Sequence, residues 1–369
     1  MTGLLDGLPH MKQRLFRGMR LIMDNNLEER IEQLEKENEL LRNWQQSTNQ
    51  LISKMIDALN EQIKKQDYYE EKSLMLQYDM AVCKGRISSL PYDLTDPELK
   101  LAVCRPKVLS TNDTIECLVS EHKSMARFGD GEFGIISGVQ RWRFQDANRS
   151  LGKRLREVLE SGNGDFLVAI NPDFYRNNIG RSDEDVMGIM AYMTDEVRKQ
   201  HAELIDEDRI YADALCFRNA KTMEDFQNIK RLWDGRKCLF IEGENTGLGV
   251  GNDLFSNCKE IHRLICPSEN AYDRYDEIFE KAKEFDKDAL VLIALGPTAT
   301  VLSFDLFREG FQAVDVGMLD MQYEAVTRNV NITDVQIEEK YCPTDIIYGD
   351  RTISPIDDAD YLKQIWKRI

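Results

Sequence analysis

The first regular pattern in the chain is a repeat of apolar residues at alternating spacings of three and four, beginning at Leu27. Such a repeat keeps one seam of a helix apolar, which is the condition for a left-handed coiled coil. An asparagine at position a favours a parallel dimer, whereas a glutamine and a threonine interrupt the seam. We therefore predict a coiled coil over residues 26–67, and hence a homo-oligomer; a single amphipathic helix packed on the rest of the chain is the alternative. Position a is held by Ile31, Asn38, Gln45, Ile52 and Leu59, and position d by Leu27, Leu34, Leu41, Thr48 and Met55.

Residues 1–25 carry basic side chains between apolar ones rather than ahead of an apolar run. This arrangement differs from a signal peptide, and no stretch of the chain is long and apolar enough to span a bilayer. A basic amphipathic helix here could lie on an anionic membrane surface, giving peripheral contact at the inner face of the cell membrane. The alternative, which we prefer, is that this helix packs on another part of the protein. The expected location is cytoplasmic.

From residue 110 to residue 325 the pattern changes to short apolar strands that alternate with helical stretches. The alternation predicts parallel βαβ units: an α/β domain with a Rossmann-like, mostly parallel sheet and helices on both faces. Residues 68–109, which contain three prolines, are predicted as a linker, and residues 326–369 as a C-terminal tail. The predicted strands are Met125–Phe128, Phe166–Ile170, Lys237–Glu242, Glu260–Cys266, Ala289–Leu295 and Gln312–Val316, and the predicted helices are Met223–Trp233, Ala271–Phe285 and Thr298–Glu309.

Charge and cysteine content narrow the classes of function. The 369 residues carry a formal net charge of −17, which argues against broad binding to a nucleic-acid backbone, since such binding uses clustered Lys and Arg. The eight cysteines are far apart, form no CxxC pair and accompany only four histidines. A Cys/His metal site is therefore not expected, and the cysteines are interpreted as reduced core thiols of a cytosolic protein.

Loops at the carboxyl ends of the strands are the candidate sites, because ligands bind there in open parallel sheets. The first loop follows the strand that ends at Phe128, and it contains Asp130 and Glu132 with a glycine on each side of the aspartate. Two carboxylates at this spacing can ligate one divalent cation, often together with substrate phosphates. An ordinary solvated acidic turn is the alternative explanation of the same residues.

The second loop runs from Glu242 to Asp253 and contains alternating glycines, among them Gly249 and Gly251. Glycines let the backbone approach a pyrophosphate closely, and a helix beginning after the loop would favour the negative charge. The spacing matches neither the dinucleotide fingerprint nor the P-loop. A glycine turn that the fold alone requires is an equal alternative.

Two further loops follow the last two predicted strands. In the third loop, Thr298 can cap the following helix and the threonine hydroxyls would lie beside exposed N–H groups, although capping alone explains them. In the fourth, a carboxylate could act as a general base or contact a sugar hydroxyl. Asp320 is preferred because it lies nearer the strand end, whereas Glu324 fits a surface helix equally well. The candidates are Gly296, Pro297, Thr298 and Thr300 in the third loop and Asp320 and Glu324 in the fourth.

Five stretches occur together in a fixed order: Arg127–Phe133, Gly249–Phe255, Cys266–Ser268, Gly296–Thr300 and Tyr323–Glu324. This combination resembles the bacterial GT-D-type glycosyltransferases, a family first described as a domain of unknown function. The resemblance covers roughly residues 110 to 324. The chain departs from the family pattern at Thr246-Gly247, where the family tends to carry Ser-Arg, and at Met318, where it tends to carry His.

The resemblance implies a metal-dependent transferase that uses a nucleotide-sugar donor, typically UDP-glucose, to build a bacterial surface glycan or glycoprotein. Asp130 and Glu132 would then lie at the metal, Mn²⁺ or Mg²⁺, and near the diphosphate. The expected catalytic residues are Asp320 and Glu324. The expected donor-binding residues are Arg127, Gly129, Glu242, Gly249, Gly251, Asn252, Asp253, Gly296, Pro297, Thr298 and Thr300.

Two other classes of function fit parts of the pattern. A catalytically inactive sugar-nucleotide-binding or scaffold protein would act through the coiled coil, with the altered loop at Thr246-Gly247 no longer supporting transfer. An NAD-dependent oxidoreductase is disfavoured, because the glycine spacing differs from the dinucleotide fingerprint. Turnover of a nucleotide sugar separates the transferase from the inactive binding protein.

Overall fold

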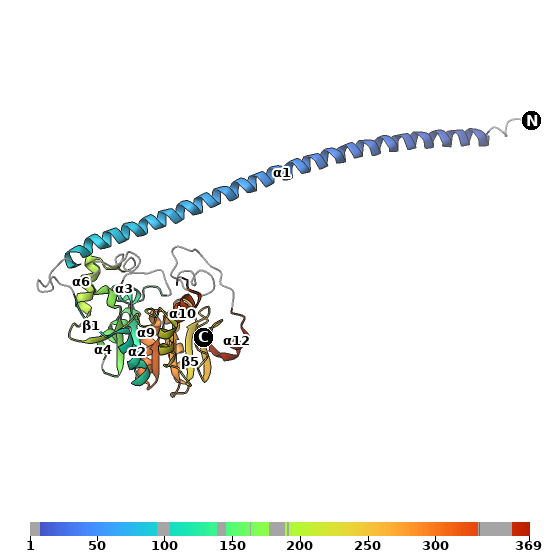
Figure 1. The fold of residues 1–369 in the computed structure, drawn as a ribbon. Coiled ribbons are helices and arrows are strands. Elements are labelled where there is room, and N and C mark those ends of the chain that lie inside the picture. Colours follow the sequence, from blue (N-terminus) through green and yellow to red (C-terminus); the bar gives the residue numbers. More distant parts are fainter. Residues whose placement is uncertain are drawn as a thin grey trace, which may run out of the picture. The chain divides into compact units, whose positions relative to one another are not determined.

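The computed structural model describes residues 8–93, 104–138, 145–162, 164–176, 192–330 and 356–369, together with positions 189 and 332. The chain divides into two units, residues 1–75 and 76–369, and each is described by itself. Helix α1 (Leu8–Asp93) begins in the first unit and ends in the second (Figure 1). None of the described helices is long and apolar enough to cross a bilayer.

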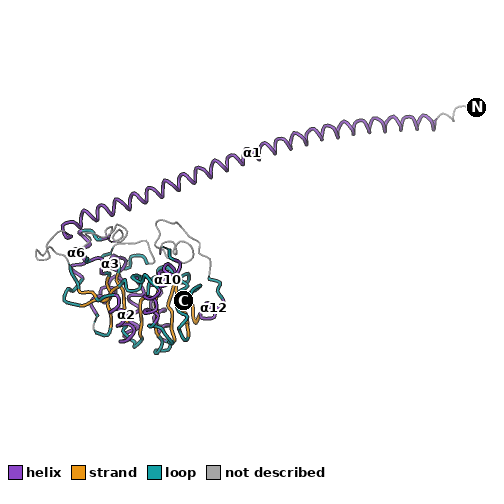
Figure 2. Tube along the Cα trace, viewed as in Figure 1, coloured by secondary structure: helices purple, strands orange, loops and turns teal. Residues whose placement is uncertain are grey.

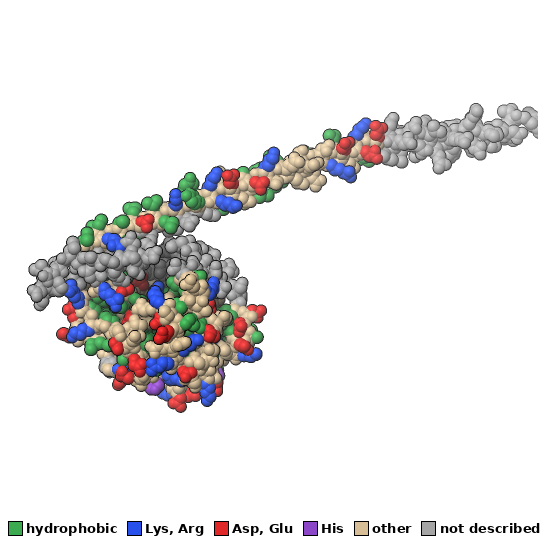
Figure 3. All heavy atoms as spheres, in the orientation of Figure 1, with side chains coloured by type: hydrophobic (Ala, Val, Ile, Leu, Met, Phe, Trp, Pro, Cys, Tyr) green, Lys and Arg blue, Asp and Glu red, His purple; other side chains and the backbone are tan. Residues whose placement is uncertain are grey.

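The predicted coiled-coil seam lies on α1, and this helix continues through residues 68–93, where a linker was predicted. The side chains of Leu34, Leu41, Ile52 and Leu59 on that seam are exposed in the single chain. Figure 3 shows apolar side chains following the described part of the helix. The side chains of the predicted basic segment, residues 1–25, lie outside the described residues. The coiled coil stays a prediction, and α1 supplies the continuous helix that it requires.

The second unit is built on one sheet with the strand order β1-β4-β3-β2-β8-β7-β5-β6-β9 (Figure 2, orange). All strand pairs in this sheet are parallel. The predicted fold class, a Rossmann-like parallel sheet with helices on both faces, is confirmed. The strands are β1 (Lys107–Val108), β2 (Ser124–Phe128), β3 (Phe166–Ile170), β4 (Ile210–Asp213), β5 (Lys237–Gly243), β6 (Glu260–Cys266), β7 (Leu290–Ala294), β8 (Gln312–Asp315) and β9 (Ile365–Arg368).

Several helices of this unit begin at side chains that accept hydrogen bonds from the first free N–H groups, as N-caps do. The Asn148 side chain caps α4, and Thr222 forms a capping box with Asp225 at the start of α7. The helices are α2 (Thr111–Ser120), α3 (Asp130–Ile136), α4 (Arg149–Ser161), α6 (Asp195–Leu204), α7 (Met223–Lys230), α8 (Tyr275–Lys283), α9 (Pro297–Arg308), α10 (Leu319–Arg328) and α12 (Ala359–Gln364), with short 3₁₀ turns η2 (Pro172–Phe174) and η3 (Ala271–Arg274).

Alternate residues of the central strands pack into different hydrophobic cores. In β7, Leu290 and Leu292 join one core, whereas Val291 and Ile293 join another. This alternation follows from the period of two along a strand whose faces are both covered. Residues of α7 and α10 belong to the first core, and residues of α8 and α9 belong to the second. The sheet is therefore buried between two layers of helices.

The six predicted strands are all present, with ends within one residue of the predicted ones. Three further strands, β1, β4 and β9, were not predicted from the sequence; they are two to four residues long. Strand β9 lies in the predicted C-terminal tail, yet it pairs with β6 through Arg263 and Ile365. The sheet thus extends beyond residues 110–325 at both ends. The predicted tail residues 333–355 lie outside the described residues.

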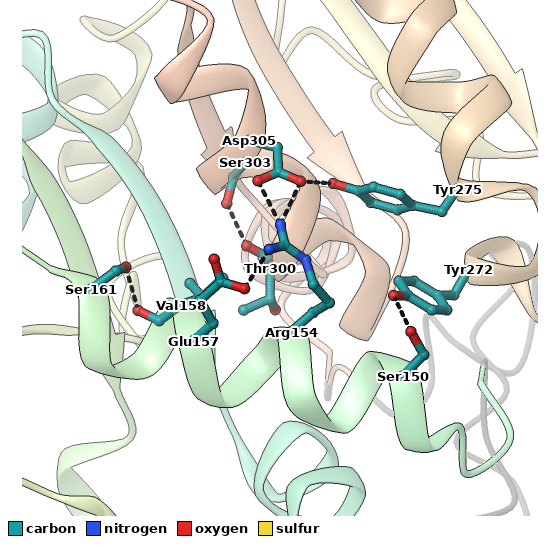
Figure 4. A network of polar contacts seen from close by, with 10 residues as sticks. All are labelled: Ser150, Arg154, Glu157, Val158, Ser161, Tyr272, Tyr275, Thr300, Ser303 and Asp305. Atoms are coloured by element: carbon teal, nitrogen blue, oxygen red, sulfur yellow. Dashed lines mark hydrogen bonds and ion pairs between the residues drawn. The ribbon is translucent and has the colours of Figure 1, made fainter.

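A polar network ties α9 to two neighbouring helices (Figure 4). The guanidinium of Arg154 on α4 donates to both carboxylate oxygens of Asp305 on α9, at 2.7 Å each. The hydroxyl of Tyr275 on α8 donates to the same carboxylate at 2.5 Å. Both hydrogen bonds to Asp305 come from Nη2 of Arg154, while Nη1 pairs with Glu157, and such charge-assisted hydrogen bonds are stronger than neutral ones. The network therefore holds α9, the helix that begins with Pro297 of the third candidate loop.

Replacing Arg154 by methionine should lower the free energy of unfolding by about 1–3 kcal/mol, because Asp305 would lose its charged donor in a largely buried position. Urea denaturation measures this loss. Arg156→Met is the matched control on the same helix, since the Arg156–Glu160 pair is exposed on both sides and should contribute less than about 1 kcal/mol. Equal losses in the two variants would contradict a clamp at Arg154.

Candidate active site at the carboxyl edge of the sheet

The four candidate loops meet at one edge of the sheet. They follow β2, β5, β7 and β8, and these strands are consecutive neighbours in the order β2-β8-β7-β5. Because all four strands are parallel, their carboxyl ends share one edge. Strand β2 pairs with β3 on one side and with β8 on the other, so the chain order reverses here. Such a switch point is where open α/β sheets bind ligands.

Arg127, at the end of β2, is held by the framework of this edge. Its guanidinium lies 3.1 Å from the carboxylate of Asp315 at the end of β8 and donates to the carbonyl of Ala214, also at 3.1 Å. Burial raises the pKa of Asp315, and the charge of Arg127 opposes that rise. Asp315 was missed in the sequence, although a carboxylate that ends an apolar strand is the signal that could have found it. The pair joins the first and fourth loops.

Gly317 is the residue that makes room for Arg127. It has φ = +51°, and a Cβ at this position would lie 1.7 Å from the Arg127 guanidinium. Only glycine combines that backbone conformation with no side chain. The backbone N–H of Gly317 also donates to Asp315 at 3.1 Å. The turn after β8 is thus shaped around the arginine–aspartate pair.

The predicted metal-binding carboxylates lie at the start of α3. The carboxylate of Glu132 accepts a hydrogen bond from the Gly129 N–H at 2.8 Å, and that of Asp130 accepts one from the Gly131 N–H at 2.9 Å. Burial raises the pKa of Glu132 to about 7, although the Gly129 hydrogen bond works against this, and the negative charges of Asp315 and Asp130 add to the rise. A cation beside Glu132 would favour the charged form of its carboxylate.

The donor set suits a hard cation that shares its coordination with a ligand. Among the residues that the structure describes, no group of three or more His, Cys, Asp or Glu side chains is arranged to hold a metal ion. Asp130 and Glu132 would therefore supply only part of a coordination shell, and phosphate and water oxygens would supply the rest. Mg²⁺ is commonly bound in this way, through one or two carboxylates and substrate phosphates. Metal binding itself stays a prediction.

The second loop is fixed from below by a buried ion pair. Glu242, fully buried at the end of β5, lies 2.5 Å from the Arg263 guanidinium of β6. Its other oxygen accepts from the Leu248 N–H at 2.7 Å, while Arg263 donates to the Leu248 carbonyl at 2.9 Å. Glu242 was predicted to bind the donor, but here its side chain is used to position the loop. No helix follows this loop: residues 244–257 form turns.

Glycine is required at different positions of this loop for different structural reasons. Gly249 has φ = +73°, and a Cβ there would meet the ring of Phe255 at 2.4 Å. Gly251 has φ = +83°, and a Cβ there would have no atom within 4 Å, so only its backbone conformation demands glycine. Gly243 lies where the loop after β5 approaches the backbone of Ser268, which a Cβ on Gly243 would meet at 2.9 Å. The glycines therefore fold the loop, whether or not a phosphate binds it.

Asn252 connects the second loop to the candidate bases on α10. Its amide donates to Asp320 at 2.7 Å and to Glu324 at 2.6 Å. Both carboxylates are less than one tenth exposed, one helical turn apart. Asp253 faces another way: it accepts from the Tyr323 hydroxyl and lies 3.5 Å from Lys230. The Tyr323 hydrogen bond is the main cause that lowers the pKa of Asp253.

The threonines of the third loop make internal contacts. The Thr300 hydroxyl donates to the Arg127 carbonyl at 3.0 Å, and the Thr298 hydroxyl lies 3.4 Å from the amide oxygen of Gln145. Both threonines are fully buried. Gly296, rather than Thr298, occupies the N-cap position of α9. What this loop offers a ligand is the positive end of the helix dipole.

Gln145 and Asp213 are further residues of this edge that were not selected from the sequence. The amide oxygen of Gln145 accepts from the Tyr272 N–H at 3.1 Å, joining the segment before α4 to the loop after β6. Asp213, at the end of β4, accepts from the Thr111 hydroxyl at 2.6 Å. For Asp213 the position at a strand end was a usable signal. Gln145 follows residues outside the described part of the chain and carried no such signal.

A buried histidine, His201, packs against α3, the helix that begins with the predicted metal-binding carboxylates. The His201 ring lies between the hydroxyls of Tyr175 and Tyr192, at 2.9 and 3.0 Å, and packs on Phe133 of α3 with ring centroids 4.1 Å apart. A neutral imidazole can serve one tyrosine as donor and the other as acceptor. The pKa of His201 is lowered to about 3, mainly by burial and also by the positive charge of Arg198.

The parallel sheet with its switch point, and the acidic and glycine-rich loops gathered there, define an α/β protein with a candidate ligand site at the carboxyl edge of its sheet. A family model described as "Glycosyltransferase GT-D fold" matches residues 125–344. The chain belongs to this GT-D glycosyltransferase family.

Curated relatives come from streptococci. The chain is 30% identical over 270 residues to "Glycosyltransferase GlyD" of Streptococcus pneumoniae, a match that covers 71% of this chain and 32% of that protein. It is 30% identical over 276 residues to "Probable glycosyl transferase Gly" of Streptococcus gordonii, covering 68% of this chain and 39% of that protein. The chain thus spans between about a third and two fifths of the length of these relatives.

Solved structures share the fold of the second unit. One is described as "A New Glycosyltransferase (DUF1792) from Streptococcus sanguinis", with a TM-score of 0.65 and 29% identity; the match covers 72% of this chain and 99% of that one. Another is described as showing that "domain of unknown function 1792 has a distinct glycosyltransferase fold", with a TM-score of 0.64 and 29% identity, covering 72% and 96%. The resemblance seen in the loop residues is confirmed at the level of the family.

Replacing Arg263 by methionine should lower the free energy of unfolding by about 3–5 kcal/mol, because it would leave the Glu242 carboxylate buried without its partner. Urea denaturation gives the value. The double variant Glu242→Gln/Arg263→Met removes both charges and should recover part of the loss. If the double variant is no more stable than Arg263→Met alone, the buried charge is not the cause.

Protonation of His201 should contribute to acid unfolding. Since the pKa is lowered in the folded state from an ordinary value near 6.5, its stabilising effect is complete above that pH and is lost as the pH falls toward 3. One proton taken up on unfolding changes stability by about 1.4 kcal/mol per pH unit. In His201→Phe, which keeps an aromatic ring, the slope between pH 6 and 4 should be smaller by up to that amount. Parallel slopes in the two proteins would contradict the assignment.

Proposed function

We propose that this chain is a metal-dependent glycosyltransferase that moves a hexose, with glucose the expected sugar, from a UDP-sugar to a glycan or glycoprotein acceptor in bacterial surface polysaccharide synthesis. The observation that carries the proposal is the meeting of the four candidate loops at one switch point of a parallel sheet. Family membership supports transfer from an activated donor. The acidic residues at the edge support the choice of a cation-assisted reaction.

In this mechanism Asp130 and Glu132 would hold a divalent cation, which when bound neutralises charge that develops on the departing diphosphate. The N-terminal end of α9 points its dipole at the same edge and favours negative charge there. Arg127 is already paired with Asp315, so its part is to fix the relative positions of β2 and β8. The chain thus contributes mainly a fixed electrostatic environment.

The acceptor hydroxyl needs a base, and Asp320 is the first candidate. Its carboxylate shares the Asn252 amide with Glu324, so the two acids and the second loop form one unit. The two hydrogen bonds from the Asn252 amide hold both carboxylates in place beside the second loop. Movement of Asn252 toward a bound donor would release Asp320 for the acceptor.

An inactive sugar-nucleotide-binding protein is the second candidate, for a specific reason. Both candidate bases are occupied by Asn252, and Met318, just before α10, replaces a polar residue that the family tends to carry. In that case a donor would bind without being consumed. The partners are proposed to include a second copy of the chain, joined through residues 26–67, and the inner face of the cell membrane, contacted peripherally through residues 1–25.

Calorimetric titration of the chain with UDP-glucose and other nucleotide sugars, with Mn²⁺ or with EDTA, tests the proposal together with an assay for free UDP. Metal-dependent binding with UDP release supports a transferase and identifies its donor. Binding with no release, even with candidate acceptors, supports the inactive binding protein. Absence of binding to every nucleotide sugar would reject both.

Asp130→Asn should reduce metal-dependent transfer by about a hundredfold or more, because the variant removes a charged cation ligand from the diphosphate site. Its helix should lose only about 0.3–1 kcal/mol of stability, from the weaker interaction with the dipole. Asp276→Asn, in the first turn of α8, is the control for removing a helix-start charge. UDP release rates of Asp130→Asn within a few fold of the unchanged chain would reject the metal assignment.

A further inference from the structure

The apolar seam of α1 is interrupted by polar residues after Leu59 and then resumes further along the same helix. In the same heptad register, position d continues at Leu76, Cys83 and Leu90, and position a at Met80 and Ile87. These apolar side chains are exposed, with Leu76 61%, Met80 69% and Ile87 69% accessible, and Cys83 is also exposed. A second apolar stretch therefore follows a polar interval in one unbroken helix.

The exposed side chains of this stretch are arranged as in a coiled-coil interface, with apolar residues along the seam and charged residues at its borders. Leu76, Met80, Cys83 and Ile87 line one shallow hollow along the helix, with Asp79 and Lys84 at its borders. In the heptad, Asp79 occupies position g and Lys84 position e, the two positions that border an a/d seam. On the opposite side of the same helical turns, Val82 and Gly85 are buried. The exposed side is thus distinct from the side that is already covered.

Charges at the borders of the seam select a partner. In a parallel, in-register pair, position g of one helix faces position e of the next heptad on the other. Arg30 then faces Glu35, Glu37 faces Arg42, and Asp79 faces Lys84. By its place in the sequence, Lys65 would likewise face Glu70. Wherever both positions are charged, the charges are opposite, at both ends of the helix.

The uncharged border positions fit the same pairing. Leu51 at position g would face Ile56 at position e of the second helix, and both are exposed apolar side chains in the single chain, at 60% and 51%. Ile31, Ile52 and Ile87 at position a, combined with leucines at position d, favour two strands over three or four. An asparagine at position a, as at Asn38, adds the same preference.

We propose that α1 pairs with α1 of a second copy of this chain as a parallel, in-register, two-stranded coiled coil from residue 27 to residue 90. The pairing places the two Cys83 side chains opposite each other at the seam. An antiparallel pair centred on the same residues would instead separate them by tens of ångströms, since a helix rises about 1.5 Å per residue. The inference extends the pairing through residues 26–67 that is part of the proposed function, and it does not depend on the donor or on transfer activity.

Disulfide crosslinking of the full chain tests the register. Mild oxidation with copper phenanthroline in air should give a dimer band on a non-reducing gel, and Cys83→Ser should remove it. In the Cys83→Ser background, Ser73→Cys at position a should restore the band, whereas Ser53→Cys at the outward position b should not. A band that survives Cys83→Ser unchanged, or that forms equally well from Ser53→Cys, would overturn the proposal.

Charge exchange tests the orientation without cysteine chemistry. Asp79→Lys places lysine against Lys84 of the second copy and should raise the dimer dissociation constant about threefold to tenfold. The double variant Asp79→Lys/Lys84→Asp reverses the pair and should return the constant to near its original value. Analytical ultracentrifugation measures the constant, and the mass of the unchanged chain should be that of a dimer. A monomeric or trimeric mass, or a double variant weaker than Asp79→Lys, would overturn the proposal.

Discussion

The ion pair between Glu242 and Arg263 is the interaction on which the candidate site depends most directly. Two charges that are almost fully excluded from water are tolerated only when each has its hydrogen bonds satisfied. Here Glu242 accepts from the backbone N–H of Leu248, and Arg263 donates to the backbone carbonyl of Leu248 and to the Gln364 side chain at 2.8 Å. One pair thus joins the neighbouring strands β5 and β6, the glycine-rich loop and the C-terminal segment. Because an unpaired charge would be costly to bury here, the charged forms of Glu242 and Arg263 are stable only as a pair.

The candidate site is acidic, and this constrains what can bind there. Asp130, Glu132, Asp315 and Asp320 lie at the ends of neighbouring strands or just after them, and Arg127 is already neutralised by Asp315. A diphosphate approaching this edge would meet net negative charge from the protein. A divalent cation bound at this edge would reduce that repulsion, and the proposed cation-dependent reaction rests on this argument. The net negative charge of the whole chain, −17, adds to this repulsion of an anion.

The sequence predicted the framework of the sheet well because the central strands are apolar on both faces. Runs such as Lys237–Gly243 admit few other structures when helical patterns flank them. Strand β9 carried no comparable signal, since its place depends on pairing with β6 rather than on its own residues. The roles of Glu242 and Thr298 also escaped prediction. Both are polar residues in loops that resemble ligand-binding loops. Only their hydrogen-bond partners in the structure show that their side chains face the protein interior.

Strand β9 also affects how the protein is made. It is the outer neighbour of β6 in the sheet, yet it follows β6 in the chain only after β7, α9, β8 and α10 have been made. At about 5–20 residues per second of synthesis, the edge of β6 lacks its partner for several seconds. An unpaired edge can template pairing with another strand. Nascent chains of this protein therefore pass through an interval of exposure to misassembly, during which the Arg263 side chain also lacks Gln364 and the ring of Tyr361.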